Sequence, residues 1–391
     1  MSATTITLGL IGALISLVCW ANFGRGVSRI ARTVAQGQPA PGRFFPFFPR
    51  LWTMLKEFLA HTRMNKFRTV GWAHWLVMIG FLGGFPLFFE AYGQSINPEF
   101  HWPVIGNTFG WHLWDEILGI GTVVGIVTLI IIRQLNHPRV PSRLSRFSGS
   151  RFLPAYTIEA IVLVEGLGMV FVKAGKIATY HHSNPGSDFF TMQVAKLLPA
   201  SPTMVAVFAL IKLLSGSLFL FLVGNNVNWG VAWHRFAAFP NIFFKREADG
   251  GVALGPLKPM TSGGRALTME TADPDNDAFG AGKIEDFSWK ALLDFTTCTE
   301  CGRCQSQCPA WNTGKPLSPK ILIMSLRDHA YEKAPYLLAG GRTDMGGEEV
   351  GLVDADGNEL TAKLEAIPEA ARAQAQRPLV GEANGNEGGA V

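Results

Sequence analysis

The chain has 391 residues, of which 48% are hydrophobic and only 16% are charged, with 11 Trp and 28 Phe. An average soluble domain carries about 25% charged residues, so this composition excludes a wholly soluble protein. It indicates a membrane protein, in contact with lipid, with a soluble part attached. The formal net charge of +4 says little by itself, and no nucleic-acid partner is expected.

Five apolar stretches predict membrane-spanning helices. No positive charge precedes the first stretch, which favours a retained helix over a cleaved signal peptide. The stretches are residues 5–23, 71–92, 115–132, 154–174 and about 203–234. A helix needs about 20 residues to cross a bilayer. The fifth stretch is longer, so that helix must tilt or project from one face.

The distribution of Lys and Arg predicts the orientation of these helices. Basic residues are frequent between the first and second stretches, between the third and fourth, and after the fifth. None lies in residues 93–114, and the loop between the fourth and fifth stretches carries only Lys176 and Lys196. Because basic loops stay in the cytoplasm, we expect a multi-pass protein of the cell inner (plasma) membrane. Its N-terminus would be outside, and everything after residue 235 would be cytoplasmic.

A cysteine motif in the cytoplasmic part predicts a [4Fe–4S] cluster. Cys298, Cys301, Cys304, Cys308 and Pro309 form the pattern C-x2-C-x2-C-x3-C-P, which is typical of such clusters. A zinc knuckle would more often show two C-x2-C pairs further apart. A disulfide is disfavoured in a reducing compartment.

The number of clusters is left open by this motif. In two-cluster ferredoxins the fourth cysteine of such a run binds the other cluster. The remaining cysteine, Cys19, lies far away in an apolar stretch. Either one cluster uses these four cysteines, or further ligands come from a partner or from sequence that is absent here.

Two histidines are candidate haem ligands. His74 lies just inside the second stretch, and His234 lies at the end of the fifth. These helices would run in opposite directions, so the two imidazoles could reach one level and hold a b-type haem iron from both sides. Alternatively, both residues belong to an aromatic belt with neighbouring tryptophans. His61 is expected outside the hydrocarbon.

Several carboxylates fall within or beside the apolar stretches. Glu159 and Glu165 lie in the fourth stretch, where a charged side chain usually faces the bundle interior. They could form a proton path for quinone chemistry or hydrogen bonds to another helix. Glu90, Asp115 and Glu116 cluster towards the outer face. We expect ordinary surface charges there, unless a quinol site opens.

These features predict an all-α membrane protein. The expected parts are a five-helix haem b-type bundle in residues 1–240, a linker in 241–290, a small α-helical ferredoxin-like segment in 291–345 and a disordered tail in 346–391. Residues 43–62, rich in Phe, Trp and basic residues, are expected to form an interfacial amphipathic helix or a plain connector.

The order of these parts resembles a family of fused membrane iron–sulfur reductases. In that family a nitrate-reductase-gamma-like haem b domain precedes a heterodisulfide-reductase-like part. The resemblance is greatest to the actinobacterial-type electron transfer flavoprotein:menaquinone dehydrogenases, and it covers the chain to about residue 345. It is carried by residues 73–75, 91–94, 230–246, 298–309 and 312–320.

The resemblance implies an electron path. Reduced electron transfer flavoprotein would pass single electrons through the cluster on the four cysteines and a haem b between His74 and His234 to menaquinone. Nitrate reductase gamma subunits carry a second histidine pair where this chain has Gly84 and Gly216, so an outer haem is not expected at that place.

The family also continues into further cysteine motifs, so we expect the N-terminal part of a longer oxidoreductase or one half of a split one. The alternative is a non-catalytic membrane anchor that docks a separate cysteine-rich redox subunit. A transporter or sensor would require helices broken near the midplane of the membrane, which the sequence does not predict.

Overall fold

The computed structural model describes residues 2–139, 145–248, 259–344, 348–354, 356–375 and 377–380, and these are mostly helical. The contacts divide the chain into two compact units, which are interleaved in the sequence and are described separately below. The first unit comprises Met1–Gly26, His61–Arg143 and Arg151–Asn226. The second comprises Val27–Ala60, Leu144–Ser150 and Val227–Val391.

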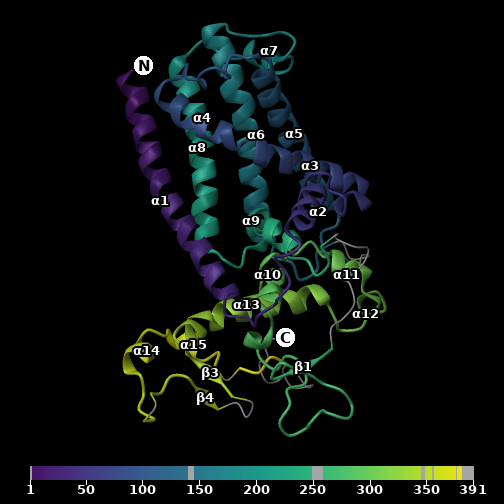
Figure 1. The fold of residues 1–391 in the computed structure, drawn as a ribbon. Helices are drawn as coiled ribbons and strands as arrows, with labels where there is room; N and C mark the ends of the chain where they lie inside the picture. Colours follow the sequence, from purple (N-terminus) through teal and green to yellow (C-terminus); the bar gives the residue numbers. More distant parts are fainter. Residues whose placement is uncertain are drawn as a thin grey trace. The chain divides into compact units, whose positions relative to one another are not determined.

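The first unit is a bundle of apolar helices (Figure 1). Its helices are α1 (Ala3–Val34, of which residues to Gly26 belong here), α3 (Arg68–Gly83), α4 (Phe85–Ile96), α5 (Phe109–Leu135), α6 (Phe152–Tyr180), the short α7 (Thr191–Ala195) and α8 (Pro202–Asn225), with the 3-10 turn η1 (Met64–Lys66). Within the described residues, α1, α5, α6 and α8 are each long and apolar enough to cross a membrane, and α3 with α4 forms a bent pair that makes a fifth crossing if it counts as one. The predicted helical membrane architecture is confirmed.

The second predicted stretch is a broken helix. α3 and α4 meet at an angle of 51° around Gly84. Pro86 lies in the first turn of α4, where its missing amide hydrogen is tolerated but ends the ladder of the preceding helix. A Cβ at Gly84 would lie 2.6 Å from the Met169 methyl carbon. The bend was not predicted, because hydropathy runs unbroken through it.

The predicted end of the fifth stretch is wrong. α8 ends at Asn225, and a new helix, α9 (Gly230–Phe243), follows and belongs to the second unit. The side-chain amides of Asn225 and Asn226 donate to the carbonyl oxygens of Phe221 and Leu222, at 3.0 and 2.8 Å. These bonds satisfy the last carbonyls of the helix, so the helix ends although the apolar composition continues.

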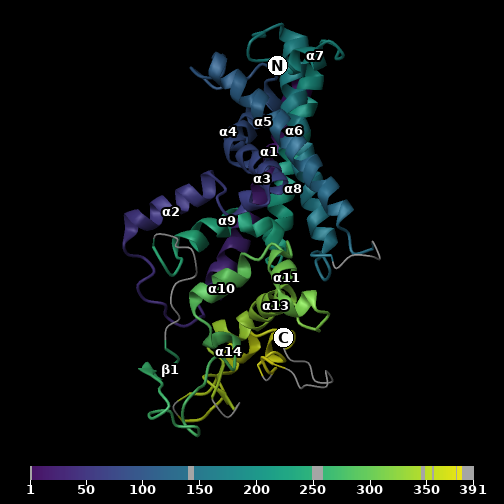
Figure 2. The ribbon, with the colours of Figure 1, turned by 90° about the vertical axis from the view of Figure 1, so that its right-hand side faces the viewer.

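Close packing orders the bundle. α5 contacts α3 and α6, α6 contacts α8, and α8 contacts α4, as the two ribbon views agree (Figures 1 and 2). Small residues allow these approaches, as is common between membrane helices. A Cβ at Gly125 would lie 2.6 Å from the Ala73 carbonyl oxygen, and one at Gly168 would lie 3.0 Å from the Lys212 side chain.

The second unit is built around α13. Its elements are α2 (Phe47–Leu59), α9, η2 (Ile284–Asp286), α10 (Trp289–Thr296), α11 (Arg303–Gln307), α12 (Pro309–Asn312), α13 (Pro319–Leu338), α14 (Thr361–Glu365) and α15 (Glu369–Arg372). Two short antiparallel hairpins pair β1 (Thr261–Ser262) with β2 (Arg265–Ala266), and β3 (Arg342–Thr343) with β4 (Glu349–Val350).

Residues 43–62 contain one helix, α2, which packs on α9 (Figure 2). The guanidinium group of Arg50 is buried and donates to the carbonyl oxygens of Phe243 and Lys245, at 3.3 and 2.5 Å. These are the orphan carbonyls at and beyond the end of α9. The side chain of Arg50 therefore ties the two helices together.

The predicted linker and tail both contain ordered elements. Residues 259–290 include the β1–β2 hairpin, η2 and the start of α10, while 249–258 lie outside the described residues. In the predicted tail, Leu352, Ile367, Ala371 and Leu379 join one buried core with Tyr336 of α13. The described part therefore differs from the predicted disorder, because several of its sparse apolar residues contribute to this core. Residues 381–391 lie outside the described residues.

Candidate iron–sulfur site

The four cysteines of the motif lie on one loop between α10 and α12. Cys298 follows α10, Cys304 is in α11, and Cys308 precedes the first residue of α12. Cys301 and Cys304 are exposed, whereas Cys298 and Cys308 are half-buried. The described residues contain no group of three or more His, Cys, Asp or Glu side chains arranged to bind a single metal ion.

The loop is tightly curled by two left-handed residues. Glu300 and Gly302 have φ angles of 58° and 68°. A Cβ at Gly302 would collide with the carbonyl oxygen of Arg146, so this position requires glycine for space as well as for conformation. The sequence did not predict the segment that presses against Gly302.

That segment, residues 145–150, supports the loop through hydrogen bonds. The Gln305 side chain, which is fully buried, donates to the carbonyl oxygens of Ser145 and Ser148 at 3.4 and 3.3 Å. The Ser150 hydroxyl donates to the Glu300 carbonyl oxygen at 2.7 Å. The segment lies about 150 residues before the motif, and no sequence signal pointed to it.

Two buried cations from α13 lie beside the loop. The amine of Lys320 donates to the carbonyl oxygens of Arg146 and Ser148, at 3.0 and 2.5 Å, and to the Ser150 hydroxyl at 2.8 Å. Burial lowers the pKa of Lys320 to about 8. Arg327 donates to the Cys298 carbonyl oxygen at 3.4 Å and forms an ion pair with Glu300 at 3.0 Å. Both side chains are only 1% exposed.

The donor set fits an iron–sulfur cluster. All four donors are thiols on one short loop, and a cubane spreads its thiolate ligands over a larger body than a single ion does. Burial raises the pKa of the Cys298 and Cys304 thiols, so iron must displace their protons on binding. The positive charges of Lys320 and Arg327 lie where they would offset the resulting thiolate charge.

His74 has a partner that the sequence did not predict. On α3 of the first unit, its Nδ1 lies 2.9 Å from Nε2 of His61. His61 is only 6% exposed, so it is buried rather than displayed on a polar surface. Its backbone has a φ of 49°. A histidine that binds a metal commonly has its second ring nitrogen hydrogen-bonded in this way, which fixes the tautomer. The contact with His61 therefore suits a metal-binding role for His74.

His234 lies on α9 of the second unit, in a separate helix and not at the end of the fifth span. Burial, with a smaller contribution from the charge of Arg235, lowers the pKa of His234 to about 4. The imidazole is therefore neutral near pH 7, which is the form that can ligate iron. His74 and His234 belong to different units, and their common haem remains a prediction.

The carboxylates of the fourth stretch bond to neighbouring helices. Glu159 forms an ion pair with Arg133 of α5 at 2.6 Å, and Glu165 accepts a hydrogen bond from Ser215 of α8. Of the two predicted roles, the structure shows the hydrogen bond to another helix. Asn225 and Asn226 likewise bond to carbonyl oxygens of their own helix.

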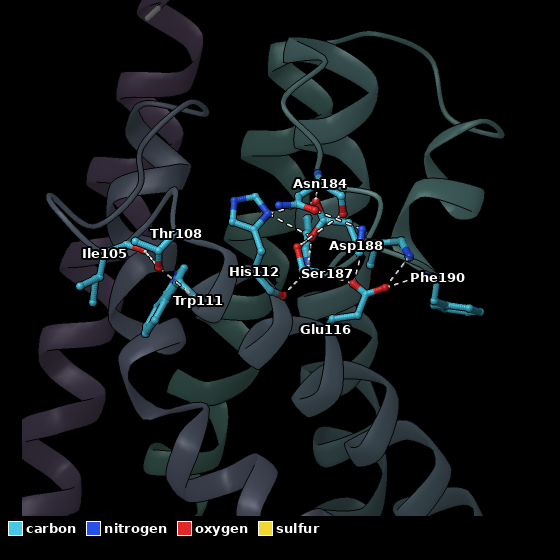
Figure 3. A network of polar contacts seen from close by, with 12 residues as sticks. Ile105, Thr108, Trp111, His112, Glu116, Asn184, Ser187, Asp188 and Phe190 are labelled. Atoms are coloured by element: carbon cyan, nitrogen blue, oxygen red, sulfur yellow. Dashed lines mark hydrogen bonds and ion pairs between the residues drawn. The ribbon is translucent and has the colours of Figure 1, made fainter.

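The expectation of surface charges near the outer face is wrong for two of three residues. Glu90 and Glu116 are 4% and 1% exposed. Glu116 accepts from the backbone amides of Phe190 and Thr191, at 2.7 and 2.9 Å, and pairs with Lys173 at 2.9 Å (Figure 3). Its partners lie more than 50 residues away in sequence, which is why the sequence did not reveal the burial.

Comparison with known proteins finds no matching family model and no solved structure that matches significantly. The chain is 30% identical over 322 residues to the EtfAB:quinone oxidoreductase of Syntrophomonas wolfei, covering 78% of this chain and 41% of that protein. It is 44% identical over 100 residues to the probable iron-sulfur-binding oxidoreductase FadF of Bacillus subtilis, covering 26% of this chain and 12% of that protein.

A third relative is the probable membrane-anchored ferredoxin of Chromohalobacter salexigens, which is 32% identical over 120 residues, covering 28% of this chain and 18% of that protein. The chain thus spans less than half the length of each of these curated relatives. The predicted resemblance is confirmed: the chain is similar to membrane-bound iron–sulfur oxidoreductases.

Proposed function

We propose that this chain transfers electrons in a membrane, from a cytoplasmic donor to a quinone, through a [4Fe–4S] cluster on Cys298, Cys301, Cys304 and Cys308. The observation that carries the proposal is the four-thiol loop, which buried cations hold in place. The described residues of the same chain also contain four or five helices that are long and apolar enough to cross a membrane. The donor is electron transfer flavoprotein and the acceptor is menaquinone. The name of the Syntrophomonas relative supports both classes of partner.

The residues of the chain have two tasks in this proposal. The bound cluster supplies the site that stores one electron. Lys320 and Arg327 hold the loop through backbone carbonyl oxygens and place positive charge beside the thiolates, which favours the reduced, more negative form. The hydrogen bonds of Gln305 and Ser150 join the supporting segment, residues 145–150, to the cysteine loop.

A b-type haem completes the proposed path. His74 and His234 would hold its iron, and the hydrogen bond between His74 and His61 supports His74 in this role. The test is a reduced-minus-oxidised haemochrome spectrum on the detergent-purified full chain. We expect about one haem per chain, lost in His74→Ala and in His234→Ala. A folded chain with no haem would leave the cluster as the one redox centre of this proposal.

The cluster is tested by electron paramagnetic resonance on the anaerobically purified chain. Dithionite reduction should produce a [4Fe–4S] signal with about four iron atoms per chain, since a cubane holds four. Cys304→Ser should reduce both the signal and the iron content. Zinc bound in place of iron, or unchanged iron in Cys304→Ser, would contradict the proposal.

The alternative function is a membrane anchor that docks a cysteine-rich redox subunit. The observation that favours it is the similarity to the probable membrane-anchored ferredoxin of Chromohalobacter salexigens, which is 32% identical over 120 residues. Purified chain that carries the cluster but reduces no quinone from reduced electron transfer flavoprotein would support the anchor. Turnover by the chain alone would exclude it.

The proposed topology has the N-terminus outside and the cluster on the cytoplasmic side of the plasma membrane. The charge distribution of the loops supports it. Fusion of green fluorescent protein after residue 380 should give fluorescence, because this reporter matures in the cytoplasm. Fusion of alkaline phosphatase at the same point should be inactive. The reverse pattern would show that the topology is opposite to the proposed one.

A further inference from the structure

The polarity of α2 (Phe47–Leu59) is inverted relative to a helix on the surface of a soluble protein. One apolar stripe runs along it, with members spaced by four, three and four residues, which places them on one face. The members are Phe48, Trp52, Leu55 and Leu59. Their exposed fractions lie between 37% and 78%. A surface helix of a soluble protein buries such a stripe against the core, so this exposed stripe requires an explanation.

The polar residues of α2 face the protein instead. Positions 50, 53 and 57 lie about half a turn from the stripe, because each residue advances the helix by about 100°. Arg50 is buried by its bonds to the end of α9. The Thr53 hydroxyl donates to the carbonyl oxygen of Ala248 at 2.8 Å, and Glu57 forms an ion pair with Lys245. Rotation of α2 to bury the stripe would break all of these contacts.

Aromatic contacts hold α2 in the same orientation. The ring centroids of Phe58 and Phe239 lie 4.3 Å apart, and those of Phe47 and Phe243 lie 5.4 Å apart. Phe239 and Phe243 belong to α9. α9 therefore covers one flank of α2 and leaves the stripe on the next flank exposed.

The place of α2 in the chain indicates that the lipid bilayer covers the stripe. Residues 35–46 join α2 to α1, and residues 60–67 join it to the bent pair of α3 and α4. α1, and this pair taken together, are long and apolar enough to cross a membrane. Since an extended chain covers at most about 3.6 Å per residue, residues 60–67 keep the end of α2 within about 30 Å of the start of α3. The chain therefore tethers α2 at both ends to segments that cross the bilayer.

The charges beside the stripe match anionic lipid headgroups. Residues 43–60 contain a single acidic residue, Glu57, and its carboxylate pairs with Lys245 on the protein side. Lys56 is exposed at the edge of the stripe, and Arg43 is half-buried just before the helix. Helices that lie in a membrane interface combine Phe, Trp and Leu on one face with basic residues beside it. The exposed side of α2 has this composition.

We propose that α2 lies in the headgroup layer of the membrane. Phe48, Trp52 and Leu59 insert between the acyl chains, and Lys56 binds the phosphate of an anionic phospholipid. Because Arg50 ties α2 to α9, this contact anchors the unit that carries the cysteines to the membrane surface. The inference concerns a lipid surface and does not depend on the proposed electron path.

The test places the photoreactive residue p-benzoylphenylalanine at Phe48 in the full chain. Intact cells are irradiated, and the peptide that contains position 48 is analysed by mass spectrometry. We expect a phospholipid adduct on this peptide. The matched control carries the same probe at Phe279, an exposed phenylalanine of the second unit outside α2, and should give no lipid adduct above background.

A protein adduct at position 48, from a second copy of the chain or from another protein, would overturn the inference. Lipid adducts of equal yield at positions 48 and 279 would overturn it as well. If the chain with the probe at Phe48 does not accumulate, the probe is placed at Trp52 with the same expected result. The iron content is measured on the same preparation, and a chain that gives the lipid adduct without iron contradicts the cluster alone.

The headgroup is tested in nanodiscs that contain equal amounts of phosphatidylglycerol and phosphatidylcholine. The chain with the probe at Phe48 should give about fivefold more adduct with phosphatidylglycerol, the effect of about one basic side chain at an anionic surface. Lys56→Gln should remove this preference, whereas Lys363→Gln, at an exposed position of α14, should retain it. Equal yields of the two lipid adducts in the chain that keeps Lys56 would overturn the role given to Lys56.

Discussion

At the scale of single residues, the cysteine loop depends on cations that are completely buried. Arg327 is 1% exposed, and its guanidinium group contacts Glu300 at 3.0 Å and Asp328 at 3.1 Å. Such a group is stable only while its partners are in place, because an isolated charge is very unfavourable in the interior. The sequence indicates the cysteines, but nothing in it marks Arg327 as their support.

Arg327→Leu should therefore destabilise the second unit. The substitution leaves Glu300 buried without its cation, and breaking a buried pair in this way typically lowers the free energy of unfolding by about 3–5 kcal/mol. The measurement is the iron content per chain after purification, together with chemical unfolding. Arg372→Leu, at an exposed position of α15, is the control and should retain the iron. Equal iron in both variants would contradict the role given to Arg327.

His329 gives the second unit a pH dependence. Burial lowers its pKa to about 4, and its Nδ1 lies 3.3 Å from Oε1 of Gln374. The unfolded chain has an ordinary histidine pKa of about 6.5. Between pH 6.5 and 4 the unfolded state therefore binds a proton that the folded state does not.

The free energy of unfolding should consequently fall as the pH is lowered through this window, by at most about 1.4 kcal/mol per pH unit for one proton. Urea unfolding from pH 7 to pH 4.5 measures the slope, and His329→Gln should remove this contribution. An unchanged slope in His329→Gln would show that another group is responsible.

At the scale of elements, α13 joins the cluster loop to the C-terminal segments. Its first turn carries Lys320, which bonds to residues 146–150, and its last turns carry Tyr336, which packs with Ile367 and Leu379. The segment after residue 346 looked disordered because it is rich in Ala, Glu, Gln and Gly. A few well-placed apolar side chains suffice to fold it, since α13 offers them a ready surface.

Ile367→Ala should lower the free energy of unfolding of the second unit by about 2–4 kcal/mol, the usual range for a buried large-to-small change. Val380→Ala, at a position that is 68% exposed, should change it by less than about 0.5 kcal/mol. Thermal unfolding of the two variants gives the comparison. If both behaved like the wild-type chain, the packing of Ile367 would contribute nothing to stability.

At the scale of the whole molecule, the two units do not correspond to two lengths of chain. Residues 27–60 and 145–150 belong to the second unit, although membrane helices of the first unit precede and follow them. The hydropathy pattern predicted one boundary near residue 240. The contacts show instead that the chain passes from one unit to the other several times. It does so because basic loops between the spans pack against the segment that holds the cysteines.

A fragment of residues 227–391 should therefore hold its cluster poorly. It lacks the carbonyl oxygens of Arg146 and Ser148 that bind Lys320 and Gln305, so these buried donors would lose their partners. The loss is measured as iron and sulfide per chain after anaerobic reconstitution, compared with the full chain treated identically. A fragment that retains the iron content of the full chain would show that the interleaved segments are dispensable.

The sequence by itself determined the features that are local in the chain. Thiols at fixed spacing indicate an iron–sulfur site, and runs of apolar residues about 20 long indicate membrane helices. Both depend on neighbours in sequence. The tertiary structure alone decided that α8 ends at Asn225, that His61 meets His74, and that Glu116 is buried among donors from distant parts of the chain. Pairing and burial depend on which distant groups come together, and no local pattern encodes that.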